Sequence, residues 1–289
     1  MRTDLLPPIA DVRHLVQLAL QEDLTPLGDL SSSLLPAGLT SNAQLETRES
    51  GVIAGTTCVN EVLLQMDSEI AINWFVAEGE SVEAGTVLAE ITGPFSSILT
   101  AERTALNFLS HLSGIATNAS KWVQLASGRV KVWDTRKTLP GYRSLQKAAV
   151  RAGGANNHRG NLSDWIMLKD NHLAHSSIAE AVGLAKDRWP GRTVQVEVDN
   201  EAQASEALAA GVDILMFDNF EPQRLTKAVV ALKSEAASAG LRVPLLEASG
   251  GISLETLDAY ADTGVDLVSS GSLTNTTHVL DIGLDVSAS

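Results

Sequence analysis

The second half of the chain alternates short apolar runs with longer segments of helical spacing. Strands that alternate with helices in this way form βαβ units, in which the strands are parallel and the helices pack against the sheet. The first run is not followed by the GxGxxG fingerprint of a dinucleotide-binding fold. The pattern therefore favours an α/β barrel of the TIM type, which six strands leave incomplete. The six runs, within residues 130–272, are "VKVWD", "WIMLKD", "TVQVEVD", "DILMFD", "VPLLEAS" and "DLVSSGS".

The first part of the chain follows a different pattern, which indicates a separate domain. Residues 9–22, "IADVRHLVQLALQE", place apolar residues at helical spacing, and a turn-rich segment follows them. Residues 41–93 carry short β-like runs with a glycine near each turn. Residues 101–126 have the pattern of a long amphipathic helix. We predict that this helix joins two domains.

Within the β-rich region, residues 78–93, "EGESVEAGTVLAEITG", look like the hairpin of a biotinyl or lipoyl carrier. Such a carrier needs an acceptor lysine, and no lysine precedes Lys121. We therefore interpret the region as scaffold. The predicted domains are an α/β sandwich-like domain in residues 1–103 and an α/β barrel in residues 104–275, with the tail 276–289 packing against the first domain.

The charge balance excludes two classes of partner. The net charge is -14 over 289 residues, and both nucleic-acid binding and attraction to anionic membranes need a positive field. Cys58 is the only cysteine, so no intrachain disulfide can form, and no apolar run has the length of a signal peptide or a membrane span. We predict a cytoplasmic protein.

One segment departs from this acidic balance. Between Lys131 and His172, eight lysines and arginines accompany only three aspartates. Charged or small polar residues also follow nearly every predicted strand, and in a parallel barrel these strand ends meet at one rim, where the βα loops build active sites. Any one of these charges could simply mark where burial stops. Their combination predicts one pocket with a basic side and an acidic side.

The basic side has the chemistry of an anion site. Arg136 and Arg159 offer planar forks that grip carboxylates through two hydrogen bonds, while Lys137, Lys169 and His158 supply compact donors. Several cations that face one small pocket repel one another unless an anion is bound. We predict a small polycarboxylate as the ligand.

The acidic side suits a hard divalent cation. Glu197, Asp218 and Glu247 follow three successive predicted strands, and magnesium binds through one or two carboxylates plus substrate phosphates. The loops "EASGGIS" and "SSGSLTN" after the last two strands stand where barrels commonly bind phosphate through backbone N–H groups. Each motif alone also fits an ordinary strand end or tight turn, so the prediction rests on their combination.

These residues resemble those of a known family. The segment "DTRKTLPGYR", then "NHR" and "LKDNH", with "EVD", "FDN" and "EASGGI" following in order, is similar to the quinolinate phosphoribosyltransferase family, also called nicotinate-nucleotide pyrophosphorylase (carboxylating). The resemblance runs from "QEDLTPLGDLSS" to "THVLDIGLD". It implies that quinolinate and phosphoribosyl pyrophosphate give nicotinate mononucleotide, pyrophosphate and carbon dioxide in de novo NAD biosynthesis. It also implies a two-domain homodimer.

The resemblance further implies roles for individual residues. Glu197 and Asp218 match carboxylates associated with Mg²⁺, which Mn²⁺ could replace, and act in catalysis together with Lys137 and Lys169. Arg103 of "ERTALN" would reach the pocket from the partner subunit. The implied quinolinate-binding residues are Arg136, Lys137, His158, Arg159 and Lys169, and the implied phosphate-loop residues are Ser249, Gly250 and Gly271.

Two departures and two alternative functions remain open. Gly160 precedes Asn161, whereas the family usually has a variable residue and then glycine, and Asn275 stands where the family often has histidine. A lysine at a barrel strand end, here Lys169, is also how Schiff-base aldolases arrange their chemistry. A non-catalytic, anion-binding relative is the second alternative, although such relatives lack the intact "LKDNH" that this chain retains.

Overall fold

The structure is a computed structural model that describes residues 3–286 and divides the chain into two compact units. The N-terminal unit consists of the chain up to Ser120, residues 138–154, and the chain from Leu273 onward. The barrel unit consists of Lys121–Lys137 and Ala155–Ser272. The chain therefore passes between the units four times. The predicted domain boundary at 103/104 falls inside a continuous helix, α3, which spans Phe95–Ala126.

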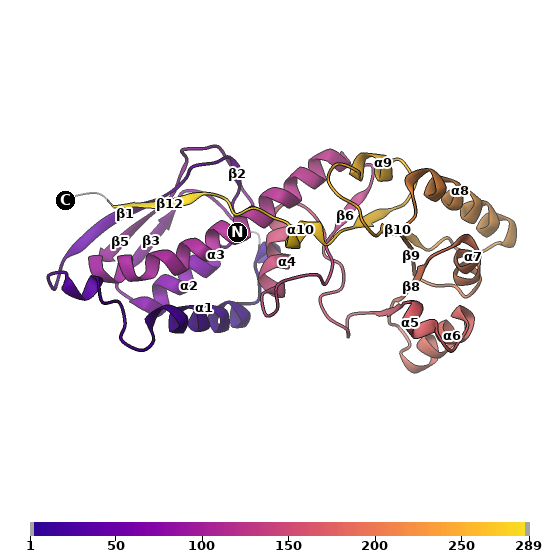
Figure 1. The fold of residues 1–289 in the computed structure, drawn as a ribbon, viewed down its shortest axis with the longest axis horizontal. Coiled ribbons are helices and arrows are strands. Elements are labelled where there is room, and N and C mark those ends of the chain that lie inside the picture. Colours follow the sequence, from indigo (N-terminus) through magenta and orange to yellow (C-terminus); the bar gives the residue numbers. More distant parts are fainter. Residues whose placement is uncertain (1–2, 287–289) are drawn as a thin grey trace. The chain divides into compact units, whose positions relative to one another are not determined.

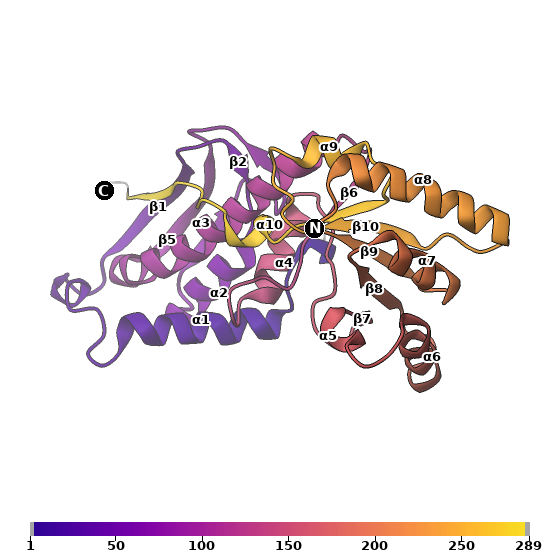
Figure 2. The same ribbon diagram turned by 45° about the vertical axis from the view of Figure 1, so that its right-hand side comes forward.

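The N-terminal unit is built on a four-stranded antiparallel sheet with the order β12-β1-β5-β3. The last strand of the chain pairs with the first, Leu45 lying opposite Leu284. In both views the helices α1, α2 and α3 lie on one side of this sheet (Figures 1 and 2). The elements of the unit, besides α3, are two 3-10 helices (Thr3–Leu5 and Ser32–Leu34), α1 (Ile9–Leu24), β1 (Thr40–Thr47), β2 (Gly51–Val52), α2 (Thr56–Met66), β3 (Ala71–Trp74), β4 (Ser81–Val82), β5 (Val87–Pro94), α4 (Arg143–Ala152) and β12 (Ile282–Val286).

The helix predicted at residues 9–22 is confirmed as α1, which buries Val12, Val16 and Leu20, spaced four residues apart. Helix α2 was not predicted, because its sequence "TTCVNEVLLQM" is rich in β-branched residues that locally favour a strand. Burial of one helical face, which includes Val59 and Leu63, outweighs that local preference.

The barrel unit contains the six predicted strands, which are confirmed and form one parallel sheet with the order β6-β11-β10-β9-β8-β7. From β7 to β11, neighbours in the sheet are also neighbours in the sequence. The first strand, β6, pairs with the last, β11, so β6 and β7 form the two edges of the sheet. The barrel is incomplete because β6 and β7 do not pair with each other. Residues 138–154, which lie between these two strands in the sequence, belong to the N-terminal unit. The elements of the unit are β6 (Lys131–Trp133), β7 (Ile166–Leu168), α5 (Asp170–Leu173), α6 (Ile178–Arg188), β8 (Val194–Val198), α7 (Glu201–Ala209), β9 (Ile214–Asp218), α8 (Pro222–Ala239), β10 (Leu245–Ser249), α9 (Leu257–Ala261) and β11 (Leu267–Ser269). The next helix, α10 (Ser272–Asn275), begins at the last residue of this unit, and its other residues belong to the N-terminal unit.

The inner strands of this sheet, β8 to β11, are largely buried on both faces, as is typical of parallel sheets. Every residue from Ile214 to Phe217 of β9 is buried, while Asp218 at its carboxyl end is partly exposed. The helices α6, α7 and α8 lie on the outer side of the strands (Figure 2). Within the described residues, none of the helices has the length and hydropathy to cross a membrane.

Candidate active site

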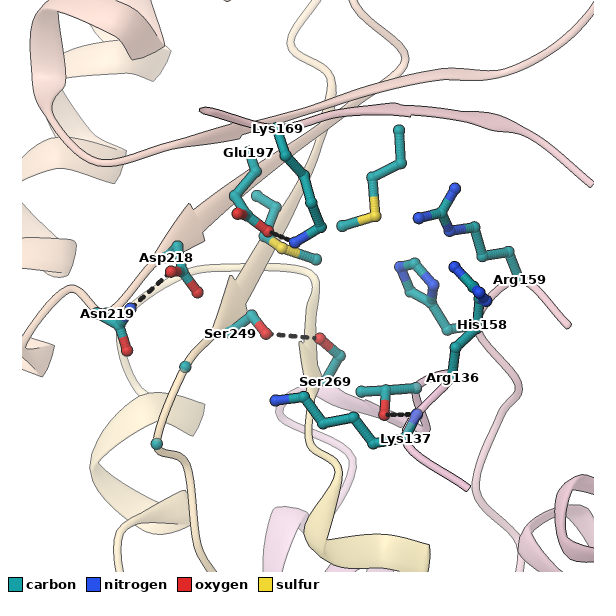
Figure 3. Close-up of a pocket in the computed structure, with 15 residues that line it drawn as sticks. Arg136, Lys137, His158, Arg159, Lys169, Glu197, Asp218, Asn219, Ser249 and Ser269 are labelled. Atoms are coloured by element: carbon teal, nitrogen blue, oxygen red, sulfur yellow. Dashed lines mark hydrogen bonds and ion pairs between the residues drawn. The ribbon is translucent and has the colours of Figure 1, made fainter. Parts of the chain in front are cut away.

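A cavity of about 560 Å³ lies at the carboxyl ends of the parallel strands, and every residue that lines it belongs to the barrel unit. Each of the six strands, or the loop beside it, contributes side chains (Figure 3). The rim predicted from the strand ends is therefore a real cavity. Nine of the predicted site residues line it: Arg136, Lys137, His158, Arg159, Lys169, Glu197, Asp218, Ser249 and Gly250.

The basic side is made by Arg136, His158 and Arg159, which lie close together in Figure 3. The Arg159 side chain is only 8% exposed. Burial lowers the pKa of its guanidinium and the charge of Arg136 lowers it further, while Asp164 and Glu197 oppose this. Two guanidinium groups that disfavour each other's charge in one cavity form a site that an anion stabilises.

Asp134, the first acid of "DTRKT", is fully buried and does not line the cavity. Its Oδ1 accepts a hydrogen bond from the backbone N–H of His158 at 2.8 Å, and its Oδ2 accepts one from Nδ2 of Asn157 at 2.8 Å. Asp134 thereby ties the end of β6 to the segment that carries His158 and Arg159. The acid is crowded beside two cations because it holds the two basic segments together.

The acidic side begins at Lys169, whose Nζ forms an ion pair with Oε2 of Glu197. Asp218 lies next to this pair on β9 and accepts a hydrogen bond from Nδ2 of Asn219 at 2.6 Å. Burial raises the pKa of Asp218, an effect that Lys169 and Lys137 oppose and that Asp199 and Asp170 reinforce. A partly buried carboxylate with a raised pKa is stabilised by an added cation.

The glycine loop after β10 is shaped for close approach. Gly250 has a φ of +90°, and a Cβ there would lie 2.7 Å from the backbone nitrogen of Asn219. Asn219 itself has a φ of 55°. Gly271 does not line the cavity, but a Cβ at that position would lie 2.8 Å from Cδ of Lys137. Both glycines therefore leave space for neighbouring site residues.

Two further predicted residues, Arg103 and Glu247, lie elsewhere, as does Asn275, which marks a departure from the family. Arg103 is exposed on α3 and Asn275 is exposed at the end of α10, and both belong to the N-terminal unit. Glu247, which the sequence grouped with the acids of the rim, is fully buried and does not line the cavity. Its carboxylate accepts hydrogen bonds from Gln195 and Ser269.

Several lining residues were missed, of which Met167, Met216, Asn219 and Ser269 are the clearest. Side chains two residues apart on a strand point to the same face, and Met167 and Met216 precede Lys169 and Asp218 by two positions. This alternation could have found both methionines. Ser269 precedes Gly271 by the same spacing.

The unusual order of Gly160 and Asn161 is accommodated by a compact loop. The backbone N–H of Gly160 donates to Oδ2 of Asp164 at 2.6 Å, and the N–H of Ser163 donates to Oδ1 of Asn161 at 2.7 Å. Short side chains that cap backbone donors in this way are typical of turns.

The described residues, 3–286, contain no group of three or more His, Cys, Asp or Glu side chains that would by itself hold a metal ion. Magnesium does not need such a group, because it binds through one or two carboxylates and completes its coordination with substrate phosphates and water. Glu197 and Asp218 line the same cavity and fit this requirement.

Two guanidinium groups, two lysines, two carboxylates and a glycine loop at the carboxyl ends of a parallel barrel define an enzyme that acts on small anionic substrates. The family follows from the whole sequence. Residues 29–113 match the model of the N-terminal domain of quinolinate phosphoribosyl transferase, and residues 115–285 match the model of its C-terminal domain. The chain belongs to the quinolinate phosphoribosyltransferase family.

Individual relatives agree with this assignment. The chain is 39% identical to the nicotinate-nucleotide pyrophosphorylase [carboxylating] of Mycobacterium leprae, over 95% of this chain and 96% of the relative. It is 40% identical to the probable nicotinate-nucleotide pyrophosphorylase [carboxylating] of Bacillus subtilis, over 91% and 89%. Among solved structures, the nicotinate-nucleotide pyrophosphorylase of Francisella tularensis superposes with a TM-score of 0.89 at 40% identity, covering 97% of each chain.

Proposed function

We propose that this cavity carries out the reaction of its family: it transfers phosphoribosyl from phosphoribosyl pyrophosphate to quinolinate, with decarboxylation. The products are nicotinate mononucleotide, pyrophosphate and carbon dioxide, and the pathway is de novo NAD biosynthesis. The observation that carries the proposal is the division of a single cavity into a side with Arg136 and Arg159 and a side with Glu197 and Asp218.

The basic side binds the dicarboxylate. Quinolinate has two adjacent carboxylates, and an unpaired charge that leaves water is very costly. Arg136, Arg159 and His158 supply donors for both groups, and Lys169 lies at the edge of this side beside Glu197. The charges of Arg136, Arg159 and Lys169 also orient the acceptor, so that the ring nitrogen faces the ribose.

The acidic side acts on the phosphoribosyl donor. As the ring nitrogen attacks the anomeric carbon and pyrophosphate departs, positive charge develops on the sugar, and a fixed carboxylate nearby stabilises that charge. Glu197 and Asp218 are the carboxylates placed for this role. The N–H groups of the loop at Ser249 and Gly250, with Lys137 beside Gly271, are suited to bind phosphate.

Glu197 and Asp218 are also the residues that would hold Mg²⁺ or Mn²⁺. The bound cation would neutralise the departing pyrophosphate. Burial of Asp218, which raises its pKa, supports this role because a cation would stabilise the ionised carboxylate.

We also propose that the chain works as a homodimer in the cytoplasm, with Arg103 of one subunit reaching the cavity of the other. The exposure of Arg103 on α3 supports this proposal. So do three exposed leucines of the N-terminal unit, Leu27, Leu30 and Leu34, which are 76%, 63% and 85% exposed. These three leucines lie within eight residues of the sequence, and exposed apolar side chains that gather on a surface commonly mark an interface.

The Schiff-base alternative is disfavoured by the contact of Lys169, because an amine that pairs with a carboxylate is not a free nucleophile. The test of the proposed function is the formation of nicotinate mononucleotide from quinolinate and phosphoribosyl pyrophosphate, with nicotinate as the control acceptor. Quinolinate should react and nicotinate should hardly react. A desolvated charge pair that loses one partner costs about 2–5 kcal/mol. Equal turnover of the two acids would contradict the dicarboxylate pocket.

A further inference from the structure

A buried polar network lies behind the wall of the cavity, centred on Glu247 of β10. This side chain has no exposure to solvent. Its Oε1 accepts a hydrogen bond from the hydroxyl of Ser269 at 2.5 Å, and its Oε2 accepts one from Nε2 of Gln195 at 2.7 Å. Oε2 also lies 3.4 Å from Nε2 of His158. Because a buried carboxylate is costly unless it is paired and hydrogen-bonded, these contacts are what allow an acid at this position.

The direction of the hydrogen bonds in this network is fixed by Trp165. The indole Nε1–H can only donate, and it donates to Oε1 of Gln195 at 2.8 Å. The amide group of Gln195 must therefore turn its NH₂ towards Glu247. Gln195 is itself fully buried, so this orientation is held on both sides. The carboxylate of Glu247 is consequently the acceptor in its hydrogen bond with Gln195.

His158 is held in the same environment. Its ring lies 4.7 Å from the ring of Trp165 and 6.0 Å from that of Trp133, measured between centroids. Its backbone N–H is bound by Asp134. Nε2 of His158 lies 3.4 Å from Oε2 of Glu247 without forming a hydrogen bond to it. A lone pair on Nε2 would face this carboxylate and be repelled by it, so the geometry favours the proton on this nitrogen. His158 also lines the cavity, in which it lies beside Arg136 and Arg159 (Figure 3).

We propose that Glu247 is a positioning residue, which keeps a proton on Nε2 of His158 and holds the imidazole in the orientation that receives quinolinate. Gln195 and Ser269 fix Glu247 in turn. Glu247 itself does not line the cavity, so it acts through His158 and not on the substrate. The proposal rests on the role of His158 in the proposed function.

The first test needs neither substrate nor a variant of Glu247. In protein labelled with ¹⁵N at its histidines, the signals of His158 are identified by their loss in His158→Asn, and their chemical shifts report which ring nitrogen is protonated. Nε2 should be protonated. A deprotonated Nε2 would overturn the proposal, whatever the enzyme does with quinolinate.

The second test is a double-mutant cycle on quinolinate binding, measured by calorimetry. Glu247→Gln should raise the dissociation constant for quinolinate roughly tenfold, because the charge that lies 3.4 Å from Nε2 of His158 and orients the imidazole is lost. Added to His158→Asn, the same change should have almost no further effect, since residues that act through one another are not additive. Equal effects in the two backgrounds would assign Glu247 a purely structural role and overturn the proposal.

Glu61→Gln is the matched control for this cycle. Glu61 is also a buried carboxylate, 7% exposed, but it lies on α2 and contacts Gln65 and Arg13. The Glu61→Gln variant should bind quinolinate with unchanged affinity. If Glu247→Gln does not fold, the histidine spectrum of the wild type still decides the proposal. If quinolinate is not a substrate at all, the proposed function fails while the spectrum still tests the position of His158.

Discussion

Replacing Asp134 by asparagine would test whether a buried carboxylate holds the basic side of the site together. The wild-type side chain accepts hydrogen bonds on both oxygens, from the N–H of His158 and from the amide of Asn157. Asparagine has one oxygen, so one of the two donors would lose its acceptor and face an NH₂ group instead. Both ends of this contact are fixed, because β6 is bonded to β11 and Asp134 is fully buried.

The expected loss of stability follows from the one hydrogen bond that Asp134→Asn removes. A hydrogen bond to a charged group contributes about 1.5–3 kcal/mol, and each kcal/mol shifts the melting temperature by roughly 2–4 °C in a chain of this size. Asp134→Asn should therefore melt roughly 3–12 °C lower than wild type. Since the same bond positions His158 and Arg159, kcat/KM for quinolinate should fall by roughly 10- to 100-fold.

The measurements are scanning calorimetry and steady-state kinetics with quinolinate as the varied substrate. Asp164→Asn is the control, because Asp164 also accepts a backbone hydrogen bond in this segment, at 2.6 Å from the nitrogen of Gly160, but is exposed. Its melting temperature should change little. If the two variants behave alike, the buried carboxylate does not organise the site and this reasoning is refuted.

The remaining predictions concern the metal, the pH dependence and the dimer. Asp218→Asn should lower turnover while leaving quinolinate affinity largely intact, and activity should disappear in excess chelator; full activity without a divalent cation would contradict the metal role. Burial raises the pKa of Asp218 in the folded protein above its value in the unfolded chain. Ionised Asp218 therefore destabilises the folded protein at pH values above the raised pKa. This destabilisation is absent at pH values below the pKa of the unfolded chain. Asp218→Asn should therefore be at least as stable as wild type at neutral pH in calorimetry, with a difference that shrinks as the pH falls; a variant that is less stable at neutral pH would refute the sign. Arg103→Ala and Arg159→Ala homodimers should each be nearly inactive, and mixing them with subunit exchange should restore about one quarter of wild-type activity, since about half the dimers are mixed and each has one intact site. If exchange is demonstrated and no activity returns, Arg103 does not act across the interface.

The barrel unit was predictable because its strands are short, apolar and bounded by polar residues, a local signal that tertiary structure reinforces. The cavity at the strand ends was predictable for the same reason, since parallel strands necessarily bring their carboxyl ends to one edge. The sequence could not place α4, Arg143–Ala152, which follows β6 but belongs to the N-terminal unit. A helical pattern gives an apolar face but not the surface that the face will contact.

The buried acids could not be told from the acids of the cavity by position alone. Glu197 and Glu247 both pair in register with Met216, from the strands on either side of β9. Glu197 nevertheless contacts Lys169 and lines the cavity, whereas Glu247 contacts Gln195 and Ser269. That difference depends on which strands are neighbours in the sheet and on which of their side chains donate hydrogen bonds. The local sequence does not determine either.

The four passages of the chain between the two units limit how this protein can be divided or rearranged. One of the passages, at 137/138, follows Lys137 directly. Another, at 154/155, comes four residues before His158, counted from Gly154. No single cut releases the barrel unit, and a fragment from Lys121 to Ser272 would still carry residues 138–154, separated from the helices of the N-terminal unit that they contact. Recombination between relatives by a simple exchange of halves should for the same reason yield insoluble chimaeras, unless residues 138–154 are taken from the same parent as the N-terminal unit.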